Sequence, residues 1–155
     1  MTTWDHGGVR RRDPEMTADD RWLFNEGAHS RLYEVLGCQL QPDGSAVFGG
    51  WAPNARTVSG VGDFNHWRDG TRLEAVADSG VWQAVVPDVR PGAVYKFHIE
   101  SRVEGYRVDK ADPFAFAAEV PPRTASVASH LDHDWGDQEW MGSRAARNAL
   151  AAPMS

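Results

Sequence analysis

The chain has 155 residues, of which 41% are hydrophobic and 25% charged, the composition of an ordinary globular protein with one compact core. Its formal net charge of −6 argues against nucleic acid as a partner, because binding a polyphosphate depends on clustered Lys and Arg, and its one cysteine, Cys38, excludes an intrachain disulfide. No apolar run approaches the roughly 18 residues that a membrane span needs, so we expect no membrane partner and, by default, a cytoplasmic location.

The first expected elements are helical. Residues 1–17 are polar and charged, and we predict that they form a disordered leader. Thr17-Ala-Asp-Asp20 has the form of a capping box and Gly27 offers a stop, which predicts a helix near residues 18–26. A further helical turn is expected at Arg31–Leu36, so residues 18–37 form a short helical segment.

Short segments separated by Gly, Pro, Asp and Ser come next, a pattern typical of antiparallel all-β domains. In Val94–Glu100, apolar Tyr95, Phe97 and Ile99 alternate with polar residues, so one face of this strand is buried and Lys96 lies on the other. The expected strands are residues 46–51, 57–61, 73–77, 81–86, 94–100 and 106–108. They predict an all-β fold, an immunoglobulin-like antiparallel β-sandwich over residues 38–120 with short N- and C-terminal helical segments.

The last part of the chain is irregular. Pro121-Pro122 and the loss of alternation predict an extended linker, anchored by Phe114 and Phe116 and followed by a short helix from Asp137 to Arg147. Linker and helix together occupy residues 121–155. If nothing covers this part of the chain, the two phenylalanines are expected to form an exposed apolar patch with Trp135 and Trp140.

Three motifs in order carry a family resemblance: Trp51-Ala-Pro-Asn-Ala55, Val61-Gly-Asp-Phe-Asn-His-Trp67 and Lys110-Ala-Asp-Pro-Phe114. They resemble the glucan-binding module at the front of α-amylase-superfamily branching enzymes. The flanks also resemble bacterial 1,4-α-glucan (glycogen) branching enzyme, so the resemblance covers about residues 18–155. It implies a non-catalytic N-terminal module of glycogen biosynthesis whose partners are α-1,4-glucan and a catalytic (β/α)₈ barrel, and whose chain stops before that barrel. The family's catalytic carboxylates have no counterparts here, so neither a catalytic residue nor a cofactor is expected.

The resemblance also implies a candidate glucan site. Sugar rings present apolar faces edged with hydroxyls, so such a site needs an exposed aromatic platform beside hydrogen-bond donors. In related modules that bind glycogen, the residue matching Trp67 stacks on glucose, the one matching Lys96 donates a hydrogen bond, and the one matching Tyr106 supplies a second platform. The alternative is that Trp67 packs within its loop and Lys96 is an ordinary surface charge.

Other distinctive residues have plainer interpretations. Trp51 and Trp82 lie in predicted strands and are expected in the core, together with Phe64. A metal site is not expected, because a cluster of adjacent ligands in an irregular segment lacks the spacing of known sites. That cluster consists of His130, Asp132, His133 and Asp134.

Three strand positions carry glycine: Gly49, Gly50 and Gly60. An interior glycine costs roughly 0.5–1 kcal/mol relative to alanine through backbone entropy. We therefore expect weakened or bulged strands at these positions.

Three functions remain open from the sequence. The preferred one is an accessory domain that supports the barrel of a branching enzyme and guides glucan chains toward it. The alternatives are a free-standing α-glucan-binding module and a truncated, non-functional fragment.

Overall fold

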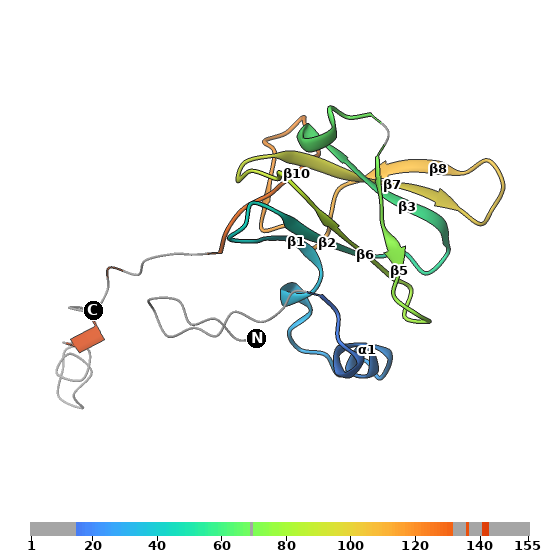
Figure 1. Ribbon diagram of the computed structural model, residues 1–155, viewed down its shortest axis with the longest axis horizontal. Helices are drawn as coiled ribbons and strands as arrows, with labels where there is room; N and C mark the ends of the chain where they lie inside the picture. The colour runs from blue at the N-terminus through green and yellow to red at the C-terminus, as the bar shows by residue number, and fades with distance from the viewer. Residues whose placement is uncertain (1–14, 69, 132–135, 137–140, 143–155) are drawn as a thin grey trace, which may run out of the picture.

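Two antiparallel sheets form the molecule in the computed structural model, which describes residues 15–68, 70–131, 136 and 141–142 (Figure 1). The four-stranded sheet has the order β1 (Gly37–Leu40), β2 (Ala46–Trp51), β6 (Val81–Val86), β5 (Glu74–Ala75). The six-stranded sheet has the order β4 (Thr71–Arg72), β3 (Ala55–Gly62), β7 (Val94–Ser101), β10 (Ser126–Val127), β9 (Ala117–Ala118), and β8 (Arg107–Lys110) also pairs with β7. The predicted immunoglobulin-like β-sandwich is confirmed.

Strand β7 organises the six-stranded sheet. One of its edges pairs with β3 over residues 95–101, whereas the other edge is shared between β10, opposite Val94 and Tyr95, and β8, opposite residues 97–100. The β9–β10 hairpin and the β7–β8 hairpin therefore lie at opposite ends of β7. The expected strand at residues 106–108 is found as β8, whereas β1, β4, β9 and β10 were not predicted.

Aromatic rings fill the space between the sheets. Phe48 of β2 lies at the centre, with its ring centroid 5.0 Å from that of Tyr95, 5.2 Å from Phe64 and 6.5 Å from Phe97. Trp82 and Phe64 pack against this core, as predicted. Edge-to-face contacts of this kind add to the free energy of burial and favour one arrangement of the core.

The prediction that Trp51 is a core residue is wrong, because its side chain is 58% exposed. Side chains alternate along β2, and Phe48 and Gly50 point inward, where a Cβ on Gly50 would lie 3.3 Å from the Phe97 ring. Trp51 must then point outward. Its ring meets Phe24 edge-on, with the centroids 6.3 Å apart.

The N-terminal segment lies against the outer face of the four-stranded sheet. Helix α1 (Ala18–Asn25) begins at the predicted capping box of Thr17 and Asp20, and the expected turn near residue 31 is the 3₁₀ helix η1 (Leu32–Glu34). Val35 and Leu36 pack with Val81 of β6 in a second apolar cluster, against which Phe114 also packs. The segment is therefore part of the folded unit.

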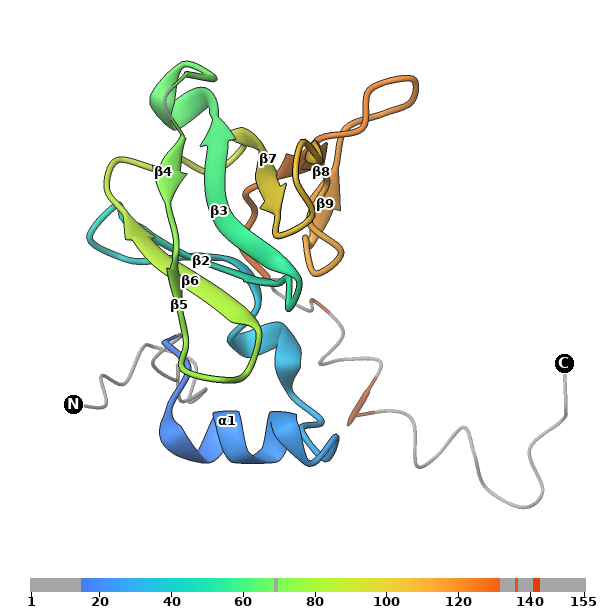
Figure 2. The same ribbon diagram turned by 90° about the vertical axis from the view of Figure 1, so that its right-hand side faces the viewer.

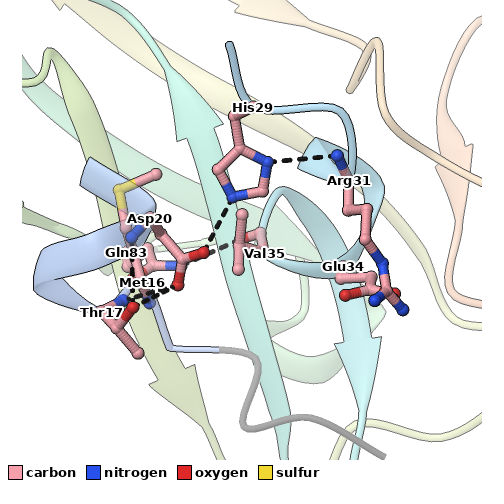
Figure 3. A network of polar contacts seen from close by, with 8 residues as sticks. All are labelled: Met16, Thr17, Asp20, His29, Arg31, Glu34, Val35 and Gln83. Atoms are coloured by element: carbon pink, nitrogen blue, oxygen red, sulfur yellow. Dashed lines mark hydrogen bonds and ion pairs between the residues drawn. The ribbon is translucent and has the colours of Figure 1, made fainter. Parts of the chain in front are cut away.

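Polar contacts fix this segment in place (Figure 3). The Met16 backbone N–H donates to Oε1 of Gln83, and Nε2 of Gln83 donates to the Val35 carbonyl, both at 2.9 Å. The buried Asp20 carboxylate accepts hydrogen bonds from Thr17, and its Oδ1 lies 2.8 Å from Nε2 of His29. Since the Arg31 N–H donates to Nδ1 of His29, that histidine donates from Nε2 to Asp20.

Gly49 makes this close approach possible. A Cβ at this position would lie 2.5 Å from the Val35 carbonyl oxygen and 3.3 Å from Nε2 of Gln83. Strand β2 pairs regularly through Gly49 and Gly50, and the irregularity in the register of β3 falls between Ala55 and Thr57 rather than at Gly60. The bulges expected at the glycines are therefore absent, and Gly49 has a packing role that its sequence context did not reveal.

A buried hydrogen-bond network around Asp112 joins the segment that follows β8 to strands β7 and β10. The Tyr95 hydroxyl donates to Oδ2 of Asp112 at 2.6 Å, Phe114 N–H donates to Oδ1 at 2.8 Å, and Asp112 N–H donates to the Ser126 hydroxyl. Burial raises the pKa of Asp112 against the opposing effect of the Tyr95 and Phe114 hydrogen bonds. Cys38 is buried as expected, and its burial, with a smaller contribution from Asp112, raises the pKa of its thiol to about 12.

Some predictions concern residues that lie outside the ranges described by the structure. Most of the leader at residues 1–17 and of the helix at 137–147 lies outside the described residues, as do Asp132, His133, Asp134, Trp135 and Trp140. Within the described ranges, no helix has the length and apolar character needed to cross a membrane.

Candidate functional site

The loop after β3 is built by the side chains of its own motif. Asn65 closes it, accepting from Gly62 N–H at 2.9 Å and donating to the Gly60 carbonyl at 2.8 Å. Phe64, between them, reaches into the core and packs on Phe48. The loop contains the 3₁₀ helix η2 (Asp63–Asn65). It is anchored both by the hydrogen bonds of Asn65 and by the packing of Phe64 in the core.

Trp67 is held on this loop with 44% of its side chain exposed. Its indole Nε1–H donates to Oδ1 of Asp63 at 3.0 Å, and Oδ2 of the same carboxylate accepts from Val94 N–H at 2.9 Å. Asp63 therefore ties the indole to the start of β7. An exposed indole whose orientation is fixed before a ligand arrives costs less entropy on binding than a mobile one.

The backbone at this point is strained. His66 and Trp67 have φ angles of 55° and 59°, in the left-handed region that non-glycine residues rarely adopt, and the arrangement costs about 1–2 kcal/mol per residue. Strain of this kind persists only where the surroundings enforce it. Here the hydrogen bonds of Asp63 and Asn65 do so, and the result is an indole presented at the surface.

Lys96 lies at the same end of the sheet. It pairs with Val61 of β3, the neighbour of Gly62, whose carbonyl accepts from Trp67 N–H at 2.9 Å. The alternation of β7 places Lys96 on the outer face, as predicted, and its Nζ donates to the Thr124 hydroxyl on the β9–β10 hairpin at 2.9 Å. The register thus places Lys96 and the loop that carries Trp67 at the same end of the six-stranded sheet.

Tyr106 lies elsewhere. Ser101 N–H donates to its carbonyl in the β7–β8 hairpin, six positions along β7 from Tyr95, or about 20 Å at 3.3 Å per residue. Figure 1 shows this hairpin and the η2 loop at opposite ends of the sheet. The strand register also pairs Glu100, on the outer face, with Arg107, so alternation assigns Tyr106 to the side opposite Lys96. Its side chain is 53% exposed.

Sequence reasoning missed three residues of this region: Asp63, Asn65 and Thr124. The first two belong to the motif that ends in Trp67, where their spacing around Phe64 is a signal for a loop closed by its own side chains. Thr124 gave no signal, because only the pairing of β10 with β7 brings its hairpin beside Lys96.

The region offers groups that can bind a ligand. An aromatic platform beside an ammonium and hydroxyl donors suits a neutral ligand with apolar faces and polar edges. Among the described residues, no three His, Cys, Asp or Glu side chains are grouped to hold a metal ion.

An antiparallel β-sandwich that presents an aromatic residue and hydrogen-bond donors at one end of a sheet has the architecture of a binding module. Residues 35–115 match carbohydrate-binding module 48, described as the isoamylase N-terminal domain, and the chain belongs to this family.

Two curated relatives narrow the likeness further. The chain is 54% identical over 138 residues to the 1,4-alpha-glucan branching enzyme GlgB of Albidiferax ferrireducens and 49% identical over 142 residues to that of Aromatoleum aromaticum. These alignments cover 88% and 90% of the chain but 22% of each relative, so the chain spans about a fifth of their length.

A solved structure agrees on the fold alone. Klebsiella pneumoniae pullulanase complexed with maltotriose is 21% identical, with a TM-score of 0.54 over 64% of this chain and 10% of the pullulanase chain.

Proposed function

We propose that the chain is the non-catalytic N-terminal module of a 1,4-α-glucan branching enzyme and that it binds α-1,4-glucan at Trp67 and Lys96. The observation that carries the proposal is the indole of Trp67, 44% exposed and hydrogen-bonded to Asp63, on a loop at the same end of the sheet as Lys96. The likeness to branching enzymes supplies the ligand class, and the acidic net charge of −6 agrees with a neutral polysaccharide rather than a nucleic acid. A cytoplasmic location is part of the proposal.

Each residue of the proposed site has its own role in binding glucan. Trp67 stacks on the apolar face of a glucose unit, while Lys96 and Thr124, already joined by a hydrogen bond, offer donors to its hydroxyls. Tyr106 belongs to the proposal as a second platform, reached only by a ligand that passes the end of the β7–β8 hairpin. Branch formation itself belongs to catalytic groups that this chain does not carry.

A second role, docking to the catalytic barrel, is favoured by one specific observation. Trp51 and Trp22 are 58% and 63% exposed, and Trp51 lies on the outer face of the four-stranded sheet, which is not the sheet that carries Trp67. Large exposed apolar side chains often mark contact surfaces. If the barrel covers the outer face of the four-stranded sheet, Trp67 on the six-stranded sheet stays free for glucan. The two roles are therefore compatible.

Retardation of the purified chain in native gels containing glycogen tests the proposal. We expect the wild-type chain to be retarded and Trp67→Ala to bind at least about tenfold more weakly, the equivalent of about 1.4 kcal/mol for a lost aromatic anchor.

Trp22→Ala is the matched control, since it removes another exposed indole. Trp22 belongs to α1, which is part of the segment that lies against the four-stranded sheet, away from Trp67. Retardation that both variants lose equally, or that a folded wild-type chain never displays, would contradict glucan binding at Trp67. The second result would leave docking to the barrel as the better function.

A further inference from the structure

Beyond Trp67 and Lys96, the outer face of β7 carries two pairs of polar side chains in a row, each formed with a residue of β8. The outward residues after Lys96 are His98 and Glu100, which face Ser59 and Thr57 on β3 and Asp109 and Arg107 on β8. Strand β8 lies beside β7 in both ribbon views (Figures 1 and 2). The row is therefore continuous with the Trp67 and Lys96 end of the sheet.

The two pairs differ in how far their hydrogen-bonding capacity is used within the protein. Glu100 is engaged twice: Oε2 accepts from the Thr57 hydroxyl at 3.1 Å, and Oε1 meets Nε of Arg107 at 3.1 Å. The carboxylate is 25% exposed, so it is largely satisfied by the protein itself.

The His98 and Asp109 pair is more open. Nδ1 of His98 lies 2.6 Å from Oδ1 of Asp109, with 37% and 55% of the two side chains exposed. Each group can form further hydrogen bonds, the histidine through Nε2 and the carboxylate through its remaining lone pairs. Their mutual contact fixes both side chains before a ligand arrives, which lowers the entropy lost on binding.

We infer that the His98 and Asp109 pair is a hydrogen-bonding subsite for a glucan chain that extends from Trp67 along β7. A sugar hydroxyl both donates and accepts, so it can satisfy a carboxylate oxygen and an imidazole nitrogen that lie side by side. The residue opposite His98 on β3 is Ser59, a small residue with a hydroxyl of its own.

The inference rests on the proposed function and specifies the direction of the bound chain. His98 lies two strand positions beyond Lys96, or about 7 Å, so a ligand that reaches both is an oligosaccharide rather than a single glucose. On this face the path runs past Glu100 and Arg107, and a ligand meets Tyr106, which alternation assigns to the other side of the sheet, only if it passes the end of the β7–β8 hairpin.

Isothermal titration calorimetry with maltoheptaose tests the direction in which the bound glucan chain runs from Trp67. We expect His98→Ala and Asp109→Ala each to raise the Kd about fivefold, and the double variant to lose little more than either single variant, because the two residues act as one subsite. Arg107→Ala is the matched control, from the neighbouring pair on the same face, and its Kd should stay within about twofold of wild type. Urea unfolding of each variant checks that the changes in Kd do not come from lost stability.

The outcomes separate this inference from the proposed function. If Trp67→Ala abolishes binding while His98→Ala and Asp109→Ala leave the Kd within about twofold of wild type, the glucan leaves Trp67 in another direction and the subsite is refuted. If Trp67→Ala also has no effect, the proposed function fails with it. Equal losses in Arg107→Ala and Asp109→Ala would overturn the assignment to the His98 pair.

Discussion

Gly49→Ala is expected to lower the free energy of unfolding by about 2–3 kcal/mol, because the new Cβ would lie 2.5 Å from the Val35 carbonyl oxygen. Neither the carbonyl nor β2 can move without disturbing the hydrogen bond from Gln83 that holds the N-terminal segment on the sheet. Urea unfolding followed by circular dichroism measures the change.

Gly60→Ala is the matched control on the other sheet. The nearest atom to a Cβ there is 3.6 Å away on the Phe64 ring, an ordinary contact. The substitution should therefore be neutral or stabilise by up to about 1 kcal/mol, through the reduced entropy of the unfolded chain. Equal effects of the two substitutions would contradict the packing role assigned to Gly49.

Asp112→Ala should cost about 3 kcal/mol, since it leaves the buried Tyr95 hydroxyl and the Phe114 N–H without their acceptor. The cost should also depend on pH. Because burial raises the pKa of Asp112 in the folded state, its contribution to stability is greatest below its unfolded pKa and declines as the pH rises through the folded one.

Urea unfolding of Asp112→Ala and wild type between pH 4 and pH 8 measures this dependence. We expect the difference in free energy between the two proteins to narrow with rising pH. Asp112→Asn, an uncharged isostere, should lose least relative to wild type at the high end of this range. A difference that widens with pH would mean that the hydrogen bonds outweigh burial in setting the pKa of this carboxyl.

Much of the fold could be predicted because local signals and burial agree. In β7, apolar and polar residues alternate without interruption, and at Thr17 the capping box lies directly before the helix that it starts. The short strands β9 and β10 were missed because two-residue strands have no periodicity of their own. β10 pairs with β7 and β9 pairs with β10, so both strands form only when the distant β7 is in place.

Trp51 illustrates a different limit. Its large apolar side chain suggested burial, yet the period of two that identified β7 also applies to β2, where Phe48 inside implies Trp51 outside. Residue type outweighed periodicity in the prediction, and the periodicity was the better guide.

For the candidate site, the sequence could place Lys96 on an exposed face but could not relate it to Trp67 or Tyr106. That relation depends on the register between β3 and β7, which joins residues more than 30 positions apart, and on the register of β8 against β7. Only with the register known does Tyr106 separate from Lys96, and only then do His98 and Asp109 come together.

Titration of the ¹⁵N-labelled chain with maltoheptaose tests the central claim most directly, through the indole N–H resonances of its tryptophans. The account predicts that the indole resonance of Trp67 shifts, because a stacked sugar changes the surroundings of the N–H that donates to Asp63. This resonance is assigned by its loss from the spectrum of Trp67→Phe. The backbone amide resonances around Lys96 should shift as well. The Trp22 and Trp51 resonances should stay in place. Shifts confined to Trp22 or Trp51, or none at saturating ligand, would contradict glucan binding on the Trp67 and Lys96 face.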